Sequence, residues 1–95
     1  MIANYLDCST GMLSHETYVQ LTGHLIMGEW PAMTVAPYEF GVFISVPPAS
    51  HIYEHADGLP EDLFCLLIYA DEHDCQVIRL DAEGDRLDDL HFHEW

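Results

Sequence analysis

Seven histidines stand among seventeen aspartate and glutamate residues, so metal binding is the first chemistry to consider. His51 and His55 are four residues apart, and His91 and His93 alternate as residues of a strand do, with Glu94 beside them. A zinc ion needs three or four ligands that converge at about 2.0–2.3 Å. Neither pair supplies that number, and no cysteine lies next to either pair. The sequence therefore predicts no metal site and no cofactor.

Thiol chemistry is the second candidate. Cys8 follows the first predicted strand, and His15 or His24 could act as its base. The spacing fixes neither pairing, and an acidic surface raises the pKa of a thiol instead of activating it. Phosphate-binding loops of the GxGxxG or GxxxxGK type do not occur, and the chain has no lysine. We therefore expect no enzyme, with a small metal- or thiol-dependent enzyme as the alternative.

Charge is the most distinctive property of the chain. Seventeen acids stand against two arginines, which gives a formal net charge of −15, and thirteen of them (all but those at positions 7, 16, 29 and 39) lie in residues 51–95. Such a chain is not expected to bind nucleic acid or an anionic membrane, because both require Lys and Arg. A basic protein partner is favoured instead. Ten acids are the candidate partner-binding residues: Glu61, Asp62, Asp71, Glu72, Asp74, Asp81, Glu83, Asp85, Asp88 and Asp89.

These ten carboxylates could imitate a nucleic acid. Duplex DNA carries one negative charge per roughly 1.7 Å of its axis. If the acids share a face, they offer a similar array to the Arg and Lys groove of a nucleic-acid-binding protein, with fast and salt-sensitive capture. Tyr53, Tyr69, Phe92 and Trp95 would act as anchors if they are exposed beside the acids. The alternative is that the acids cap helices and line a solvated surface, while the aromatic residues complete the core.

Four strands and two helices are predicted to position these residues. The strands are expected at 2–7, 33–38, 41–46 and 75–81, and the helices at 15–27 and 60–72. Ser14 is a suitable N-cap for the first helix, and Pro37 indicates an edge strand or a bulge. Residues 49–59 are predicted to be a loop. The tail from Arg86 onward is expected to dock on the sheet as a short strand or an extended segment.

The order strand, helix, strand, strand, helix, strand fits an α+β ferredoxin-like sandwich (βαββαβ). In that fold one antiparallel sheet carries two helices on one face. Ninety-five residues suit a single domain spanning 1–95, and about half of them are apolar, enough to fill a small core.

The cysteines and the lengths of the apolar runs indicate the cellular compartment in which the protein is expected. Three cysteines form no CxxC pair, no signal peptide is recognisable, and no apolar run reaches the length of a membrane span. We therefore expect free thiols and a location in a reducing cytoplasm.

Three parts of the chain resemble a known family. They are Leu6-Asp7-Cys8-Ser9-Thr10, the helix capped by Ser14, and residues 35–41 with the strand that ends at 46–47. They resemble a family of short uncharacterised proteins carried on plasmids, phages and integrative elements of proteobacteria. The resemblance implies that the cytoplasm is that of a bacterial host cell. Its motifs are turns and strands, so it transfers no catalytic residue.

The composition, separately, is similar to that of anti-CRISPR proteins, many of which are small acidic single domains from such elements. Several of them occupy the DNA-binding surface of a Cas complex. This similarity implies an inhibitor that binds a Cas effector complex by DNA mimicry. The remaining alternative is an accessory module of a mobile element, which pairs through a sheet edge or an apolar patch with another protein or with itself as a homodimer.

Overall fold

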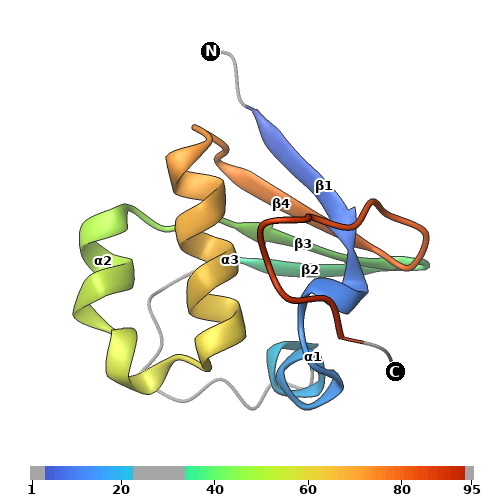
Figure 1. Cartoon of the computed structure of the whole chain (residues 1–95), viewed down its shortest axis with the longest axis horizontal. Coiled ribbons are helices and arrows are strands. Elements are labelled where there is room, and N and C mark those ends of the chain that lie inside the picture. Colours follow the sequence, from blue (N-terminus) through green and yellow to red (C-terminus); the bar gives the residue numbers. More distant parts are fainter. Residues whose placement is uncertain (1–3, 23–33, 94–95) are drawn as a thin grey trace.

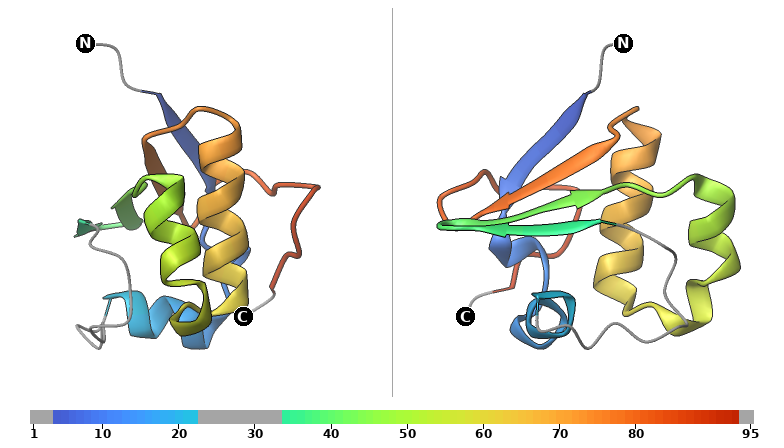
Figure 2. Two further views of the ribbon diagram at one scale, coloured as in Figure 1. Left: turned by 90° about the vertical axis from the view of Figure 1, so that its left-hand side faces the viewer. Right: turned by 180° about the vertical axis from the view of Figure 1, so that it is seen from behind.

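The computed structural model describes residues 4–22 and 34–93. Figure 1 shows α2 and α3 side by side over one face of a sheet, and in the view from behind in Figure 2 the strands pass in front of α3. The elements, with η denoting a 3-10 helix, are β1 (Tyr5–Ser9), η1 (Thr10–Met12), α1 (His15–Thr22), β2 (Val35–Tyr38), β3 (Gly41–Ser45), α2 (Ala49–Glu54), η2 (Ala56–Gly58), α3 (Glu61–Glu72) and β4 (Val77–Asp81).

The sheet is mixed, with the strand order β1-β4-β3-β2. β3 pairs in antiparallel fashion with both β2 and β4, whereas β1 pairs with β4 in parallel, with Tyr5 opposite Val77 and Ser9 opposite Asp81. The prediction of a wholly antiparallel sheet is therefore wrong, and a ferredoxin-like arrangement is not confirmed. An alternating apolar pattern specifies which face of a strand is buried, but it does not specify the neighbouring strand.

Most of the local predictions are confirmed. β2 and β3 form a hairpin that turns at Glu39 and Phe40, and β2, which contains Pro37, lies at the edge of the sheet. α3 follows Pro60 and ends at Glu72. The hydroxyl of Ser14 accepts a hydrogen bond from the backbone N–H of Thr17 at 3.2 Å, as an N-cap of α1 does. Residues 23–27 of that predicted helix lie outside the described residues.

Two local predictions are wrong. The expected loop at 49–59 contains α2 and η2, and Ile52 of α2 is fully buried. Pro47 and Pro48 suggested irregular chain, yet Pro48 occupies the N-cap position, where the helix needs no N–H from it. β1 also continues through Ser9, because Cys8 and Ser9 pair with Leu80 and Asp81 of β4.

The core lies between the helices and one face of the sheet. α3 contributes a buried stripe at the helical spacing i, i+3, i+4 and i+7, and alternate residues of the strands face it. The fully buried members of this contact are Leu63, Leu66, Leu67 and Ala70 of α3 with Cys8, Val42, Ile44, Ile78 and Leu80 of the sheet. The opposite face of the sheet, called here the open face, carries Tyr38, Phe43 and Arg79.

Residues 82–93, called here the C-terminal segment, run from β4 across the end of β1 toward η1 (Figure 1). The Asp85 carbonyl accepts a hydrogen bond from the Ser9 N–H at 2.7 Å, and the His93 N–H donates to the Gly11 carbonyl at 2.7 Å. Leu87, Leu90 and Phe92 pack against the core. The segment is thus docked without forming a strand. No helix within the described parts of the chain is long and apolar enough to cross a membrane.

Candidate functional site: the groove beside α3

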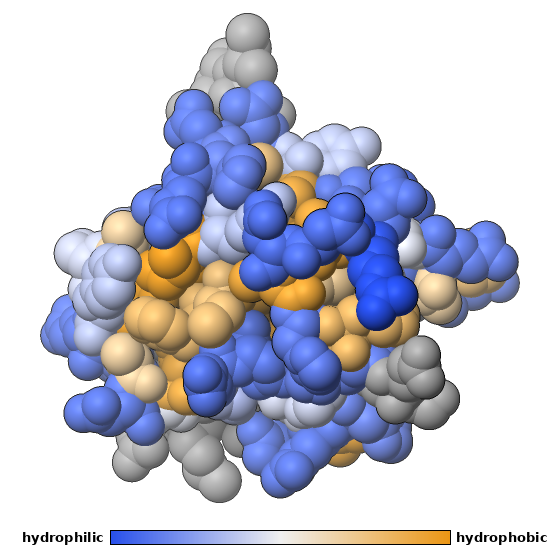
Figure 3. Space-filling view, in the orientation of Figure 1, coloured by the Kyte–Doolittle hydropathy of each residue, from blue (hydrophilic) through white to orange (hydrophobic). Residues whose placement is uncertain are grey.

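α3 presents a second row of side chains on the side away from the sheet. Phe64 and Ile68 are four residues apart, as are Cys65 and Tyr69, and all four are partly exposed. Residues at this spacing form ridges along a helix, and such ridges are the surface against which a further helix packs. Figure 3 shows apolar surface over α3 on this face, with hydrophilic residues around it.

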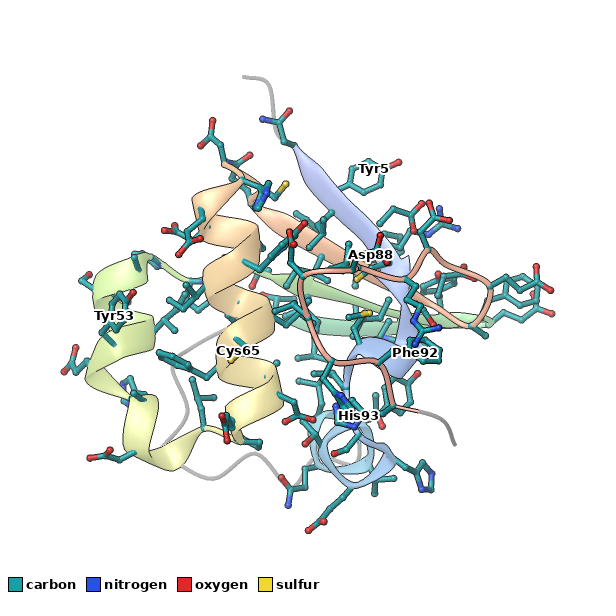
Figure 4. All side chains as sticks on the ribbon, viewed as in Figure 1. Tyr5, Tyr53, Cys65, Asp88, Phe92 and His93 are labelled. Carbon is teal, nitrogen blue, oxygen red and sulfur yellow. The ribbon has the colours of Figure 1, made fainter. Side chains whose placement is uncertain are left out.

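The C-terminal segment forms the other wall of a groove beside α3. Besides its backbone bonds to Ser9 and Gly11, it places the ring of Phe92 over Gly11, where an added Cβ would lie 2.5 Å from the ring. The guanidinium of Arg86 lies over the same ring, 4.3 Å from its centroid. Figure 4 shows Cys65 midway along α3 and Phe92 and His93 at the far end of this wall.

Two adjoining hollows make up this groove, which we call the α3 groove. The first, of about 500 Å³, is lined by Met12, Ser14, Glu61, Asp62, Cys65, Asp89, Leu90, His91 and His93. The second, of about 410 Å³, is lined by Phe64, Cys65, Ile68, Tyr69, Glu72, His73, Asp89 and Leu90. They meet at Cys65, Asp89 and Leu90, so the groove follows most of the length of α3.

Acidic side chains border the α3 groove, and neither arginine lines it. Glu61 and Asp62 lie at one end, Glu72 lies at the other, and Asp89 lies on the opposite wall. Arg79 lies on the open face of the sheet, and Arg86 lies over Phe92. Because the chain has no lysine, the fixed charges of the groove are all negative.

Of the ten predicted partner-binding acids, eight are exposed and two are not. The exposed acids lie at the first turn of α3, at its C-terminal end, in the turn after β4 and along the C-terminal segment. They are Glu61, Asp71, Glu72, Asp74, Glu83, Asp85, Asp88 and Asp89. Asp62 and Asp81 are half-buried, and both carboxylates have partners within the protein.

Asp62 joins the start of α3 to the start of α1. One carboxylate oxygen accepts a hydrogen bond from the Ser14 N–H at 2.8 Å, and the other accepts from the Thr17 hydroxyl at 2.9 Å and from the Leu63 N–H at 3.0 Å. The carboxylate therefore satisfies the free backbone N–H groups of two helix starts. This role holds the two helices together and leaves the side chain little freedom to meet a partner.

Asp81 belongs to a cluster on the open face. It accepts a hydrogen bond from the Tyr38 hydroxyl at 2.6 Å and from the Glu83 N–H at 2.8 Å, and Arg79 lies 3.3 Å away. The Tyr38 hydrogen bond, the Glu83 N–H and the Arg79 charge lower the pKa of Asp81. Arg79 also lies 3.5 Å from Asp7. Arg79 therefore offsets one of the two negative charges of Asp7 and Asp81 on this face.

Two of the residues considered for metal or thiol chemistry, His24 and Glu94, lie outside the described residues. His51 lies on α2, and His55 lies at the C-terminal end of that helix. The rings of His91 and His93 contact each other edge to face, with their centroids 4.6 Å apart. Among residues 4–22 and 34–93, no three His, Cys, Asp or Glu side chains are placed to hold a metal ion. Cys8 is fully buried, and its burial, together with the nearby Asp7 charge, raises its pKa to about 12, so the thiol is not activated.

The aromatic residues predicted as anchors differ in exposure. Tyr53 is 60% exposed, and its ring contacts that of Phe64 edge to face, with the ring centroids 5.8 Å apart. Tyr69 lines the groove and stacks on His73 at 4.1 Å, whereas Phe92 is partly buried against the core. Trp95 lies outside the described residues.

Sequence reasoning missed the apolar floor of the groove. Phe64 and Ile68 pack partly against the core, and together with Cys65 they also line the groove. The signal was present in α3, where these residues lie on the opposite side of the helix from Leu63, Leu66 and Leu67.

Within residues 4–22 and 34–93, fold and site together define a small α+β domain with an open, mixed four-stranded sheet, three α-helices and an acid-bordered apolar groove. The chain belongs to the family described as "Family of unknown function (DUF5983) C-terminal domain", whose model matches residues 5–95. No curated protein and no solved structure shows a significant match to the chain.

Proposed function

We propose that this protein is a non-enzymatic inhibitor that occupies the basic, nucleic-acid-binding surface of another protein. In its most specific form, the proposal is an anti-CRISPR protein that binds a Cas effector complex by DNA mimicry in a bacterial cell. The observation that carries the proposal is the exposure of eight of the ten candidate acids in a chain without lysine. The two ion pairs of Arg79 are with Asp7 and Asp81, so neither involves any of these eight acids.

The exposed charge supports fast capture of a basic surface. Carboxylates without a cationic neighbour in the protein are free to pair with Arg and Lys of a partner, and their summed field speeds the encounter. Capture driven by exposed charges weakens with salt, because the Debye length falls to about 8 Å at 0.15 M.

A binding experiment with competition tests the proposal. Immobilised protein is exposed to purified Cas effector complexes, and the loading of target DNA onto the bound complex is measured over a series of salt concentrations. We expect binding that blocks DNA loading and weakens as salt rises. Binding that leaves DNA loading unchanged would exclude mimicry, and failure to bind any complex would exclude the CRISPR target.

A second candidate function rests on the open face of the sheet. Tyr5 is 58% exposed and Phe43 is 39% exposed on this face, and Phe40 at the β2–β3 turn is 58% exposed. Exposed aromatic residues favour protein association, including a homodimer or an accessory module of a mobile element. Light scattering with size-exclusion chromatography in low and high salt distinguishes this candidate, because an apolar interface persists in high salt.

A further inference from the structure

The α3 groove combines features that favour one class of occupant. Its floor is apolar, formed by Phe64, Cys65, Ile68 and Leu90, and an apolar floor binds through buried surface at roughly 25 cal/mol per Å². Its border carries carboxylates and three histidines, His73, His91 and His93, but no arginine. An occupant must therefore present an apolar stripe with positive charges on both sides.

The dimensions and the ridges of the groove favour a helical occupant. α3 has 12 residues, so it is about 18 Å long at 1.5 Å per residue. Its exposed ridges at i and i+4 are the surface into which a second helix fits its own side chains. An apolar stripe at i, i+3, i+4 and i+7 on a helix of about three turns matches this length.

The acids are placed to meet cations at both ends and on the far wall. Glu61 lies in the first turn of α3 and Glu72 in its last turn, while Asp89 stands across the groove. None of these three carboxylates has an ion pair with either arginine. Lysines or arginines on both borders of the stripe would find partners along the length of the occupant.

We propose that the α3 groove binds a basic amphipathic helix of a partner protein, with its apolar stripe on Phe64, Cys65 and Ile68 and its cations on Glu61, Glu72 and Asp89. This inference rests on the proposed function, since it identifies the part of the basic partner that is bound. It adds that the contact is local and needs apolar side chains as well as charge.

The test uses a synthetic probe and the whole protein. The probe is a fluorescent peptide of about five helical turns, with leucines at i, i+3, i+4 and i+7 and lysines elsewhere. A peptide of the same composition with scrambled leucines is the control. Binding is measured by fluorescence anisotropy near 0.15 M salt, where the Debye length is about 8 Å. We expect the amphipathic peptide to bind at least about tenfold more tightly than the scrambled one.

Two matched charge variants separate the groove from the overall field. The groove variant carries Glu61→Gln, Glu72→Gln and Asp89→Asn, and the control variant carries Glu39→Gln, Glu54→Gln and Asp57→Asn, none of which is a candidate partner-binding acid. Both lose three exposed negative charges, and none of the control residues lines the groove. We expect about tenfold weaker binding for the groove variant and at most about twofold for the control, since an exposed ion pair contributes at most about 1 kcal/mol. Cys65→Arg, which places a cation on the floor, should also abolish binding of the peptide, with circular dichroism confirming the fold.

Equal losses in the two charge variants, or equal affinity for the two peptides, would overturn the groove as the binding site. The proposed function is tested separately. It fails if the protein displaces nucleic acid from none of the basic proteins tested. Selective binding of the amphipathic peptide without such displacement would leave the groove standing and remove the nucleic-acid surface as its target.

Discussion

Acidic residues have different surroundings on the two faces of the sheet. On the open face, Arg79 lies between Asp7 and Asp81, and Tyr38 donates to Asp81, so the carboxylates are paired. On the helical face, Glu61, Glu72 and Asp89 border the α3 groove without a cation. One arginine in the centre of the open face is enough to make this difference. Asp7 and Asp81 on the open face thus have an arginine partner, whereas the three acids that border the apolar groove have none.

The faces should differ most in their contribution to stability. Leu66 on α3 is fully buried against the sheet, whereas Phe43 on the open face is 39% exposed. Leu66→Ala should lower the free energy of unfolding by about 2–5 kcal/mol through lost burial and a cavity. Phe43→Ala should lower it by no more than about 1 kcal/mol. Urea unfolding of both variants measures the difference, and equal losses would mean that the open face is also part of a core.

The next effect concerns the wall of the groove. A Cβ at Gly84 would lie 2.3 Å from the Cys8 carbonyl oxygen, so Gly84→Ala must push the C-terminal segment away from β1. We expect a loss of about 1–3 kcal/mol in unfolding free energy, as for other overpacked sites. The exposed neighbour provides the control, since Glu83→Ala should change stability by less than about 0.5 kcal/mol. Hydrogen exchange should show faster exchange of the Ser9 N–H in Gly84→Ala alone.

Asp62 distinguishes a structural acid from one available for binding. Asp62→Ala leaves the Ser14 N–H and the Thr17 hydroxyl without their acceptor, which should cost about 1–3 kcal/mol. Glu61→Ala, one residue earlier and exposed, should cost less than about 0.5 kcal/mol. Thermal unfolding monitored by circular dichroism compares the two variants. If they have the same midpoint, the bridge between α1 and α3 contributes nothing to stability.

The smallest effect is on the pH dependence of the open face. The lowered pKa of Asp81 means that its stabilising contribution is complete above the ordinary aspartate pKa and is lost as pH falls through the lower, folded-state pKa. Tyr38→Phe removes the main cause of that shift, so the pKa of Asp81 should rise toward its ordinary value. A carbon NMR titration of the Asp81 carboxyl measures the change. Tyr5→Phe on the same face should leave the pKa of Asp81 unchanged. A changed pKa in that variant would mean that the shift does not depend on the Tyr38 hydrogen bond in particular.

The sequence predicted local structure well where a single segment contains the information. α3 was predicted from Pro60, its acidic first turn and its apolar stripe, and the β2–β3 hairpin from two alternating runs. α2 was missed because two prolines before a short segment are also typical of a loop. The parallel pairing of β1 with β4 depends on which strands meet in space, and this information is not contained in either strand.

The candidate site was predictable only in part, for the same reason. The exposure of eight acids follows from their polarity and their positions at helix ends and turns. The internal bonds of Asp62 and Asp81 do not, because their partners Ser14 and Tyr38 are 48 and 43 residues away. The groove requires the C-terminal segment to return to α3, and its irregular backbone gives no periodic signal.

The position of β4 between β1 and β3 has a consequence for biosynthesis. β1 is made first, yet its partner strand begins at Val77, so a nascent chain must carry β1 unpaired until residue 81 has left the ribosome. Pairing over so long a stretch of chain slows folding, because loop closure precedes any gain from the contact. Until then only the β2–β3 hairpin can form within the described sheet.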